Sequence, residues 1–140
     1  MSITLSSTFT DNLLGTSSTA GVAEQIGAGT LVLYASGGSP PAGPNESATG
    51  TVLATFTFSS AGSQGSPSAG AMTIVFNATS VTATGTGTAD YFRILNSGST
   101  ALIQGSVSTT GADWNLSSVT VNSGDSVAIT GTPSISWVVT

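Results

Sequence analysis

The stretch TADYFRILNSGST, residues 88–100, decides the fold. Side chains alternate between the two faces of a β-strand, so Phe92 and Ile94 share one face and Arg93 lies on the other. The polar turn NSGS follows at once, and its Asn and Gly tolerate the positive φ that a tight hairpin turn needs. The stretch therefore predicts a strand that ends in a hairpin turn, and it holds the only basic residue of the chain.

The same two-residue period recurs along most of the chain. In residues 51–60, for example, it places Val52, Ala54, Phe56 and Phe58 on one face of a strand. We expect further strands in GTLVLYAS (29–36), AMTIVFNA (71–78), GADWNLSS (111–118), SVTV (118–121), DSVAIT (125–130) and SISWVVT (134–140).

The segments between these strands are rich in turn-forming residues. A second hairpin turn is expected at NSGD, residues 122–125. Residues 38–50 contain three prolines and must form a loop, and residues 59–70 form a second one. Helix is expected only as short turns, at residues 11–14 behind Thr10 and in VAEQIG, which Gly27 closes.

These patterns predict one fold class. We expect an all-β protein, an antiparallel β-sandwich of the jelly-roll or Ig-like kind, with about 8–10 short strands and minimal helix near the N-terminus. Residues 1–140 should form a single β-sandwich domain, with residues 1–28 as an N-terminal arm or extension in the alternative reading.

The composition excludes several classes of partner. Only 5% of the residues are charged, against about 25% in ordinary soluble domains. The net charge is −5, and there is one Arg with no Lys and no His. Nucleic acids and anionic membranes attract Lys and Arg, so we expect neither as a partner. The sequence also predicts neither a membrane-spanning segment nor a signal peptide.

Catalytic chemistry is not expected either. The usual general base, His, and the usual thiol nucleophile, Cys, are both absent. Asp90, Asp113 and Asp125 could converge on Ca²⁺, but no spacing motif supports such a site. Trp114 and Trp137 fit a core better than a sugar-binding platform, because each has apolar residues two positions away. We therefore predict no enzyme, no catalytic or metal-binding residues and no cofactor.

Arg93 is the candidate functional residue, and two interpretations remain open. Tyr91 and Leu95 flank it on its own face of the strand. In the first, its stem packs between them and its guanidinium meets a carboxylate of the same chain. Asp113 is the first choice, with Asp90 and then Asp125 after it. In the second, this face is an interface and Arg93 reaches a partner's carboxylate or backbone carbonyls.

The low charge also suggests assembly. Soluble β-proteins protect their sheet edges with charges, prolines and bulges, and this chain has few charges for that purpose. Ser and Thr, about a third of the chain, suit strands but repel other molecules weakly. Such a surface suits a chain that packs against copies of itself or against other subunits.

One set of motifs resembles a known group of proteins. The order LVLYASGGSPPAG, TGTVLATFTF, ATGTGTADYFRI, GSVSTTGADWNLSS and VTVNSGDSVAIT covers most of residues 29–130. It resembles small all-β proteins encoded in the structural gene clusters of tailed phages, in which an Arg recurs beside an aromatic residue as Arg93 does beside Phe92. Residues 1–28 match that pattern less well.

The resemblance implies a virion structural protein. We expect a capsid decoration (cement) protein, made in the host cytoplasm, that bridges major capsid subunits on the outer surface of the capsid. Its partners would be the major capsid protein and copies of itself, in a trimer or dimer. The alternatives are a phage tail or baseplate component and, from another class, a secreted carbohydrate-binding or adhesin domain.

Overall fold

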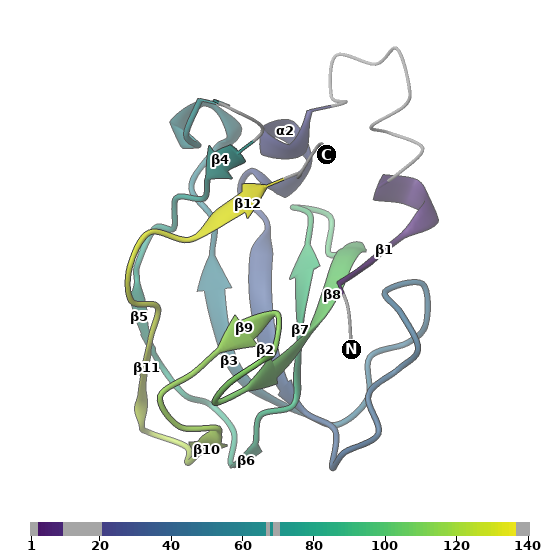
Figure 1. Cartoon of the computed structure of the whole chain (residues 1–140), viewed down its shortest axis with the longest axis vertical. Coiled ribbons are helices and arrows are strands. Elements are labelled where there is room, and N and C mark those ends of the chain that lie inside the picture. Colours follow the sequence, from purple (N-terminus) through teal and green to yellow (C-terminus); the bar gives the residue numbers. More distant parts are fainter. Residues whose placement is uncertain (1–2, 10–20, 67, 69–70, 137–140) are drawn as a thin grey trace.

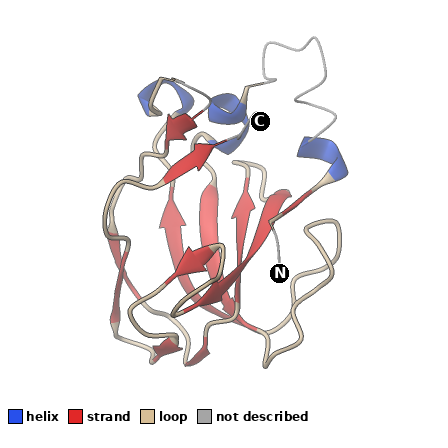
Figure 2. Cartoon of the chain, in the orientation of Figure 1, coloured by secondary structure: helices blue, strands red, loops and turns tan. Residues whose placement is uncertain are grey.

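Two β-layers face each other in the computed structural model, which describes residues 3–9, 21–66, 68 and 71–136. The chain is an all-β sandwich built almost entirely from antiparallel pairs, as the alternating patterns predict (Figure 1). Helix within the described residues is confined to α2 (Val22–Ile26), the 3-10 turn η1 (Ala61–Ser63) and a turn at residues 7–9. Figure 2 shows these helical turns at one end of the strands.

The larger layer is a sheet of six strands. Its order is β1 (Thr4–Leu5), β8 (Ala101–Ser108), β7 (Tyr91–Leu95), β2 (Thr30–Ala35) and β3 (Thr51–Thr57). The sixth strand, β9 (Trp114–Asn115), pairs with β8 in parallel, whereas the other pairs are antiparallel. This sheet supplies most of the core.

The smaller layer is one interrupted two-stranded ribbon. Along one side lie β4 (Ala71–Thr73), β5 (Ser80–Thr82) and β6 (Gly87–Thr88); they pair with β12 (Ser134–Ser136), β11 (Ser126–Ala128) and β10 (Thr120–Val121) respectively. The interruptions are bridged by bonds such as Ile74 N–H to the Pro133 carbonyl at 2.9 Å. A ribbon of two strands therefore faces a sheet of six, and it cannot cover that sheet completely.

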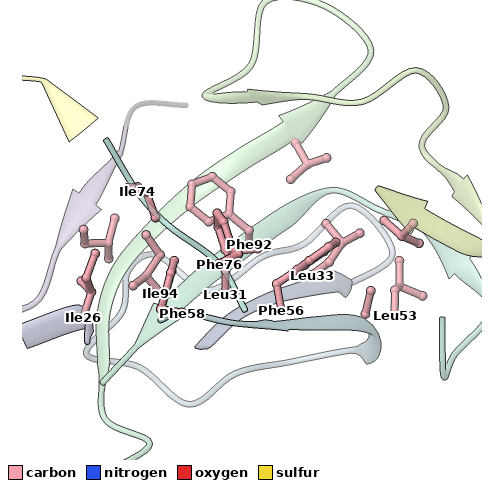
Figure 3. Packing of buried hydrophobic residues seen from close by; sticks show 14 of the residues in the cluster. Ile26, Leu31, Leu33, Leu53, Phe56, Phe58, Ile74, Phe76, Phe92 and Ile94 are labelled. Carbon is pink, nitrogen blue, oxygen red and sulfur yellow. The ribbon is translucent and has the colours of Figure 1, made fainter. Parts of the chain in front are cut away.

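The core lies between the two layers (Figure 3). Phe56 on β3 and Phe58 directly after it are fully buried and meet Phe76, with ring centroids 6.0 and 4.8 Å apart. From β7, Phe92 and Ile94 point into the same core, as the period-two pattern predicts. Burying each such side chain contributes roughly 1.5–3 kcal/mol, so this layer contact dominates the stability.

The strand β3 departs from strict alternation. Leu33 lies opposite Ala54, but Tyr34 lies opposite Val52, so the register shifts between them and Leu53 is the extra residue. Leu53 and Ala54 are both fully buried, while Val52 is 40% exposed. The prediction that Val52 lies on the same face as Ala54, Phe56 and Phe58 is wrong, because the extra residue of a β-bulge shifts the alternation of side chains beyond it.

The two Asn-Ser-Gly turns behave differently. NSGS joins the antiparallel strands β7 and β8, so the predicted hairpin is confirmed, although Ser99 takes the positive φ of 64°. NSGD joins β10 to β11, and these two strands pair with β6 and β5. The second predicted hairpin is therefore wrong, since the turn around Gly124 connects two successive strands on the same side of the ribbon, which do not pair with each other.

The described part of residues 1–28 joins the sandwich. Leu5 pairs with Ile103 of the main sheet, and Phe9 and Ile26 are fully buried in the core. The predicted helical turn of VAEQIG is confirmed as α2, with Gly27 as its C-cap. The turn predicted at residues 11–14 behind Thr10 lies outside the described residues. No helix in the part of the chain described is long and apolar enough to cross a membrane.

Candidate functional site

Arg93 lies on the outer face of the main sheet, the face turned away from the ribbon. Its neighbours across the sheet are Val32 on β2 and Gln104 on β8. Only 3% of its surface is exposed. Burying a guanidinium costs several kcal/mol in lost hydration, so its hydrogen-bond partners must replace water.

Those partners are three oxygens of the same chain. Nε donates to the side-chain oxygen of Gln104 at 2.9 Å. Nη1 donates to the backbone carbonyl of Glu46 at 2.8 Å, and Nη2 to that of Gly43 at 3.1 Å. Both carbonyls belong to the proline-rich loop, so Arg93 ties that loop to the sheet.

Gln104 continues the same contact. Its side chain is fully buried, and its amide nitrogen donates to the backbone carbonyl of Pro41 at 2.7 Å. Because the amide oxygen accepts from Arg93, both ends of this amide are bonded, and its orientation is set by the network. Gln104 therefore fixes the first part of the loop while Arg93 fixes the middle.

Tyr91 holds the last part of the loop. Its hydroxyl donates to the carbonyl of Thr49 at 2.6 Å and accepts from the amide of Thr49 at 3.1 Å. Its ring stacks on Tyr34 with centroids 4.8 Å apart, and the guanidinium carbon of Arg93 lies 5.9 Å from its centroid. That geometry adds a cation–π attraction to a charge that is already out of water.

Asp90 fixes the start of the loop. Its carboxylate accepts hydrogen bonds from the amide of Ser36 at 3.0 and 3.1 Å, from the Ser36 hydroxyl, and from the amide of Gly38 at 2.9 Å. The side chains of Asp90, Tyr91, Arg93 and Gln104 together bind the loop of residues 36–50, and we call these four residues the clamp. Asp90 directly precedes β7, Tyr91 and Arg93 lie on β7, and Gln104 lies on the neighbouring β8.

The predicted carboxylate partner of Arg93 is wrong. Asp113 accepts from the amide and hydroxyl of Ser106 at 2.9 and 2.8 Å, and it directly precedes β9, which pairs with β8 and not with β7. Asp90 binds the loop, and Asp125 accepts from the amide of Asn122 at 2.8 Å. Within the described residues the partners of Arg93 are uncharged, because carbonyl dipoles of the docked loop take the place of an anion.

Burial also acts on Tyr34 in this cluster. Burial raises the pKa of Tyr34 above its ordinary value of 10.0, and the neighbouring Tyr91 raises it further. The positive charge of Arg93 opposes both effects, since it favours the ionised phenol. The outer face therefore favours a neutral Tyr34.

A second feature is an apolar groove on the opposite face of the main sheet. It encloses about 1000 Å³ and opens between β1, the segment after β9, and residues 125–134 of the ribbon. Phe92, Ile94 and Ile103 form part of its floor. These floor residues are themselves buried, and the partly exposed apolar side chains lie around the opening of the groove.

Trp114 lines this groove from one side. It is half-buried and meets Phe56 and Phe92 edge to face, with centroids 6.1 and 5.8 Å apart. It packs against the core, as the sequence analysis expects for Trp114 in preference to a sugar-binding platform. Trp137 lies outside the described residues. No three His, Cys, Asp or Glu side chains come together as a metal site in the part of the chain that the structure describes.

The sequence interpretation missed Gln104 and the docked loop. A single Gln within the apolar segment ALIQGSV was the available signal, because a polar residue in a doubly buried strand needs partners. The geometry of the clamp is suited to fixing a loop and presenting its outer surface.

Comparison with known proteins found no matching family model, no matching curated protein and no matching solved structure.

Proposed function

We propose that this protein is a structural subunit of a tailed-phage virion, a capsid decoration protein that bridges major capsid subunits on the outer shell. One observation carries the proposal. The only basic side chain of the chain is buried in the clamp, so the described surface offers acids, hydroxyls and one anchored loop. The resemblance of residues 29–130 to virion proteins supports the same role.

The charge distribution favours the outside of a capsid. Glu24, Glu46, Asp113 and Asp125 are exposed, and Arg93 is not. A surface of this kind is repelled by DNA phosphates inside a shell, and it is attracted to Lys and Arg on a partner. The capsid subunit would therefore supply the positive side of the contact.

The anchored loop is the best contact surface for that role. Residues 45–49 are exposed, while the backbone carbonyls of Glu46 and Thr49 within this stretch are bonded to Arg93 and Tyr91. Holding a loop in its bound conformation reduces the entropy lost on association. Copies of the chain in a dimer or trimer would present several such loops at once.

Counting copies in purified particles tests the proposal. We expect many copies in fixed ratio to the major capsid protein, measured by quantitative mass spectrometry of gradient-purified virions. Detection only in the lysate contradicts any virion role. Fewer than about ten copies per particle excludes the decoration of a symmetric shell and favours the tail or baseplate alternative.

Rebinding to particles that lack the protein tests the contact surface. The change Glu46→Lys reverses a charge on the loop, and Glu24→Lys is the matched control on α2, away from it. We expect weaker rebinding of the first variant only. Equal rebinding of both variants would mean that the loop does not make the contact.

A further inference from the structure

The groove between the two layers has an incomplete wall. On the main sheet, β1 pairs only with β8 among the described strands, so its other edge is unpaired. On the ribbon, β10, β11 and β12 each pair with a single one of the strands that the structure describes. Two unpaired strand edges therefore border an apolar floor, which is where an additional strand would fit.

The hydrogen bonds of the ribbon show which backbone amides of residues 125–130 face away from β5. The amide of Ile129 donates to Thr79 at 2.8 Å, and the carbonyl of Asp125 accepts from Ala83 at 2.8 Å. In an antiparallel ladder the next residues point the opposite way, so the amides of Ala128 and Thr130 face away from β5. Both residues line the groove.

Apolar side chains are available to an incoming strand. Ile3 is 51% exposed, and Leu5, Trp114, Leu116 and Ile129 are partly exposed around the groove. An extended segment sends alternate side chains toward one face, so every second residue would contact the floor. That contact would also cover the exposed parts of these apolar side chains.

The charges around the groove define the chemistry of the occupant. Asp113 and Asp125 line the groove and are exposed. Neither is bonded to Arg93, which lies in the clamp on the other face of the sheet. The groove thus has two acids and no basic side chain among the residues that line it. A cationic occupant is favoured over a neutral or anionic one.

We propose that the groove binds an extended segment of a partner protein, in which alternate residues are apolar and flanking residues are Lys or Arg. The segment adds a strand along residues 126–130 of the ribbon, and its basic residues meet Asp113 and Asp125. This site is separate from the loop held by the clamp and does not depend on the proposed virion role.

A peptide of defined sequence tests the site on the full chain. The probe is a nine-residue peptide in which Val and Thr alternate between terminal Lys residues, and the matched control peptide has Glu at both ends. Isothermal titration at low salt should detect the Lys peptide and a markedly weaker Glu peptide. Amide NMR shifts should fall on residues 126–130 and on β1.

Two isosteric changes examine the role of the acids. Asp113→Asn and Asp125→Asn keep the oxygen that accepts from Ser106 or Asn122. Exposed ion pairs contribute modestly to binding, so the double variant should bind the Lys peptide about tenfold more weakly. Glu24→Gln removes an exposed charge away from the groove and should leave binding unchanged.

Other results would overturn the proposal. These are equal affinity for the two peptides, no binding of either one, or NMR shifts confined to residues 36–50. Concentration-dependent shifts in the groove without peptide would assign it to a second copy of the chain. Tighter binding of decanoate than of the Lys peptide would assign it to a small apolar ligand.

Discussion

Replacing Arg93 by Met tests the clamp, because Met keeps much of the apolar stem and removes the charge and all five donors. Three hydrogen bonds are lost, to Gln104, Glu46 and Gly43. Bonds from a charged donor contribute about 1.5–3 kcal/mol each. The variant also avoids the desolvation of a guanidinium, which costs several kcal/mol.

The difference between these two effects sets the expected magnitude. The fully buried oxygen of Gln104 is left without its donor, and the loop loses its central attachment. We expect the free energy of unfolding to fall by about 3 kcal/mol, a net loss in the range for breaking a buried polar network. For a domain of this size that lowers the melting temperature by about 10 °C.

Urea denaturation of single and double variants identifies the partner. Arg93→Met combined with Gln104→Leu should show a coupling energy above about 1 kcal/mol, because the two side chains share a bond. Arg93→Met combined with Asp113→Asn should be additive within about 0.5 kcal/mol. Coupling to Asp113 without coupling to Gln104 would refute the clamp and restore the carboxylate pair.

Three further predictions follow from single features. Because burial raises the pKa of Tyr34, this phenol ionises at a lower pH in the unfolded chain than in the folded one. The free energy of unfolding should therefore keep its full value below pH 10.0 and fall above it, and in urea denaturation at rising pH this fall should be smaller for Tyr34→Phe. Gly50→Ala should destabilise more than Gly37→Ala in thermal melts, since both have positive φ but only the Cβ at Gly50 would meet a backbone atom, the Ala35 carbonyl at 2.1 Å. Far-UV circular dichroism should show well under about a quarter helix, and a larger fraction would contradict the fold.

Alternation along the chain was enough to predict the sandwich and the faces of its central strands. Phe92 and Ile94 lie in the core and Arg93 opposite them, because side-chain direction in a strand depends only on parity. The exposed Val52 could not be predicted, since the bulge beside it depends on the pairing partner. The parallel pairing of β9 is likewise set by tertiary packing.

The partners of Arg93 illustrate a different limit. A carboxylate can be recognised in a sequence, and three candidates were available. Backbone carbonyls occur at every residue, so Glu46 and Gly43 carry no sequence signal as acceptors. Only the docking of the loop on the sheet turns its carbonyls toward the guanidinium. The choice of Asp113 failed because sequence distance does not say which strand lies beside which.

Amide hydrogen exchange of the loop tests the central claim most directly, namely that the only basic side chain holds residues 36–50 against the sheet. The amides of Gly38, Ala42 and Thr49 are bonded within the protein, although the loop around them is exposed. By NMR on the wild-type protein we predict that Thr49 exchanges much more slowly than its exposed neighbours Ser47 and Ala48, and that Arg93→Met removes this protection. Protection of Thr49 that is unchanged in Arg93→Met would contradict the claim, and so would exchange of Thr49 as fast as that of Ser47 and Ala48 in the wild-type protein.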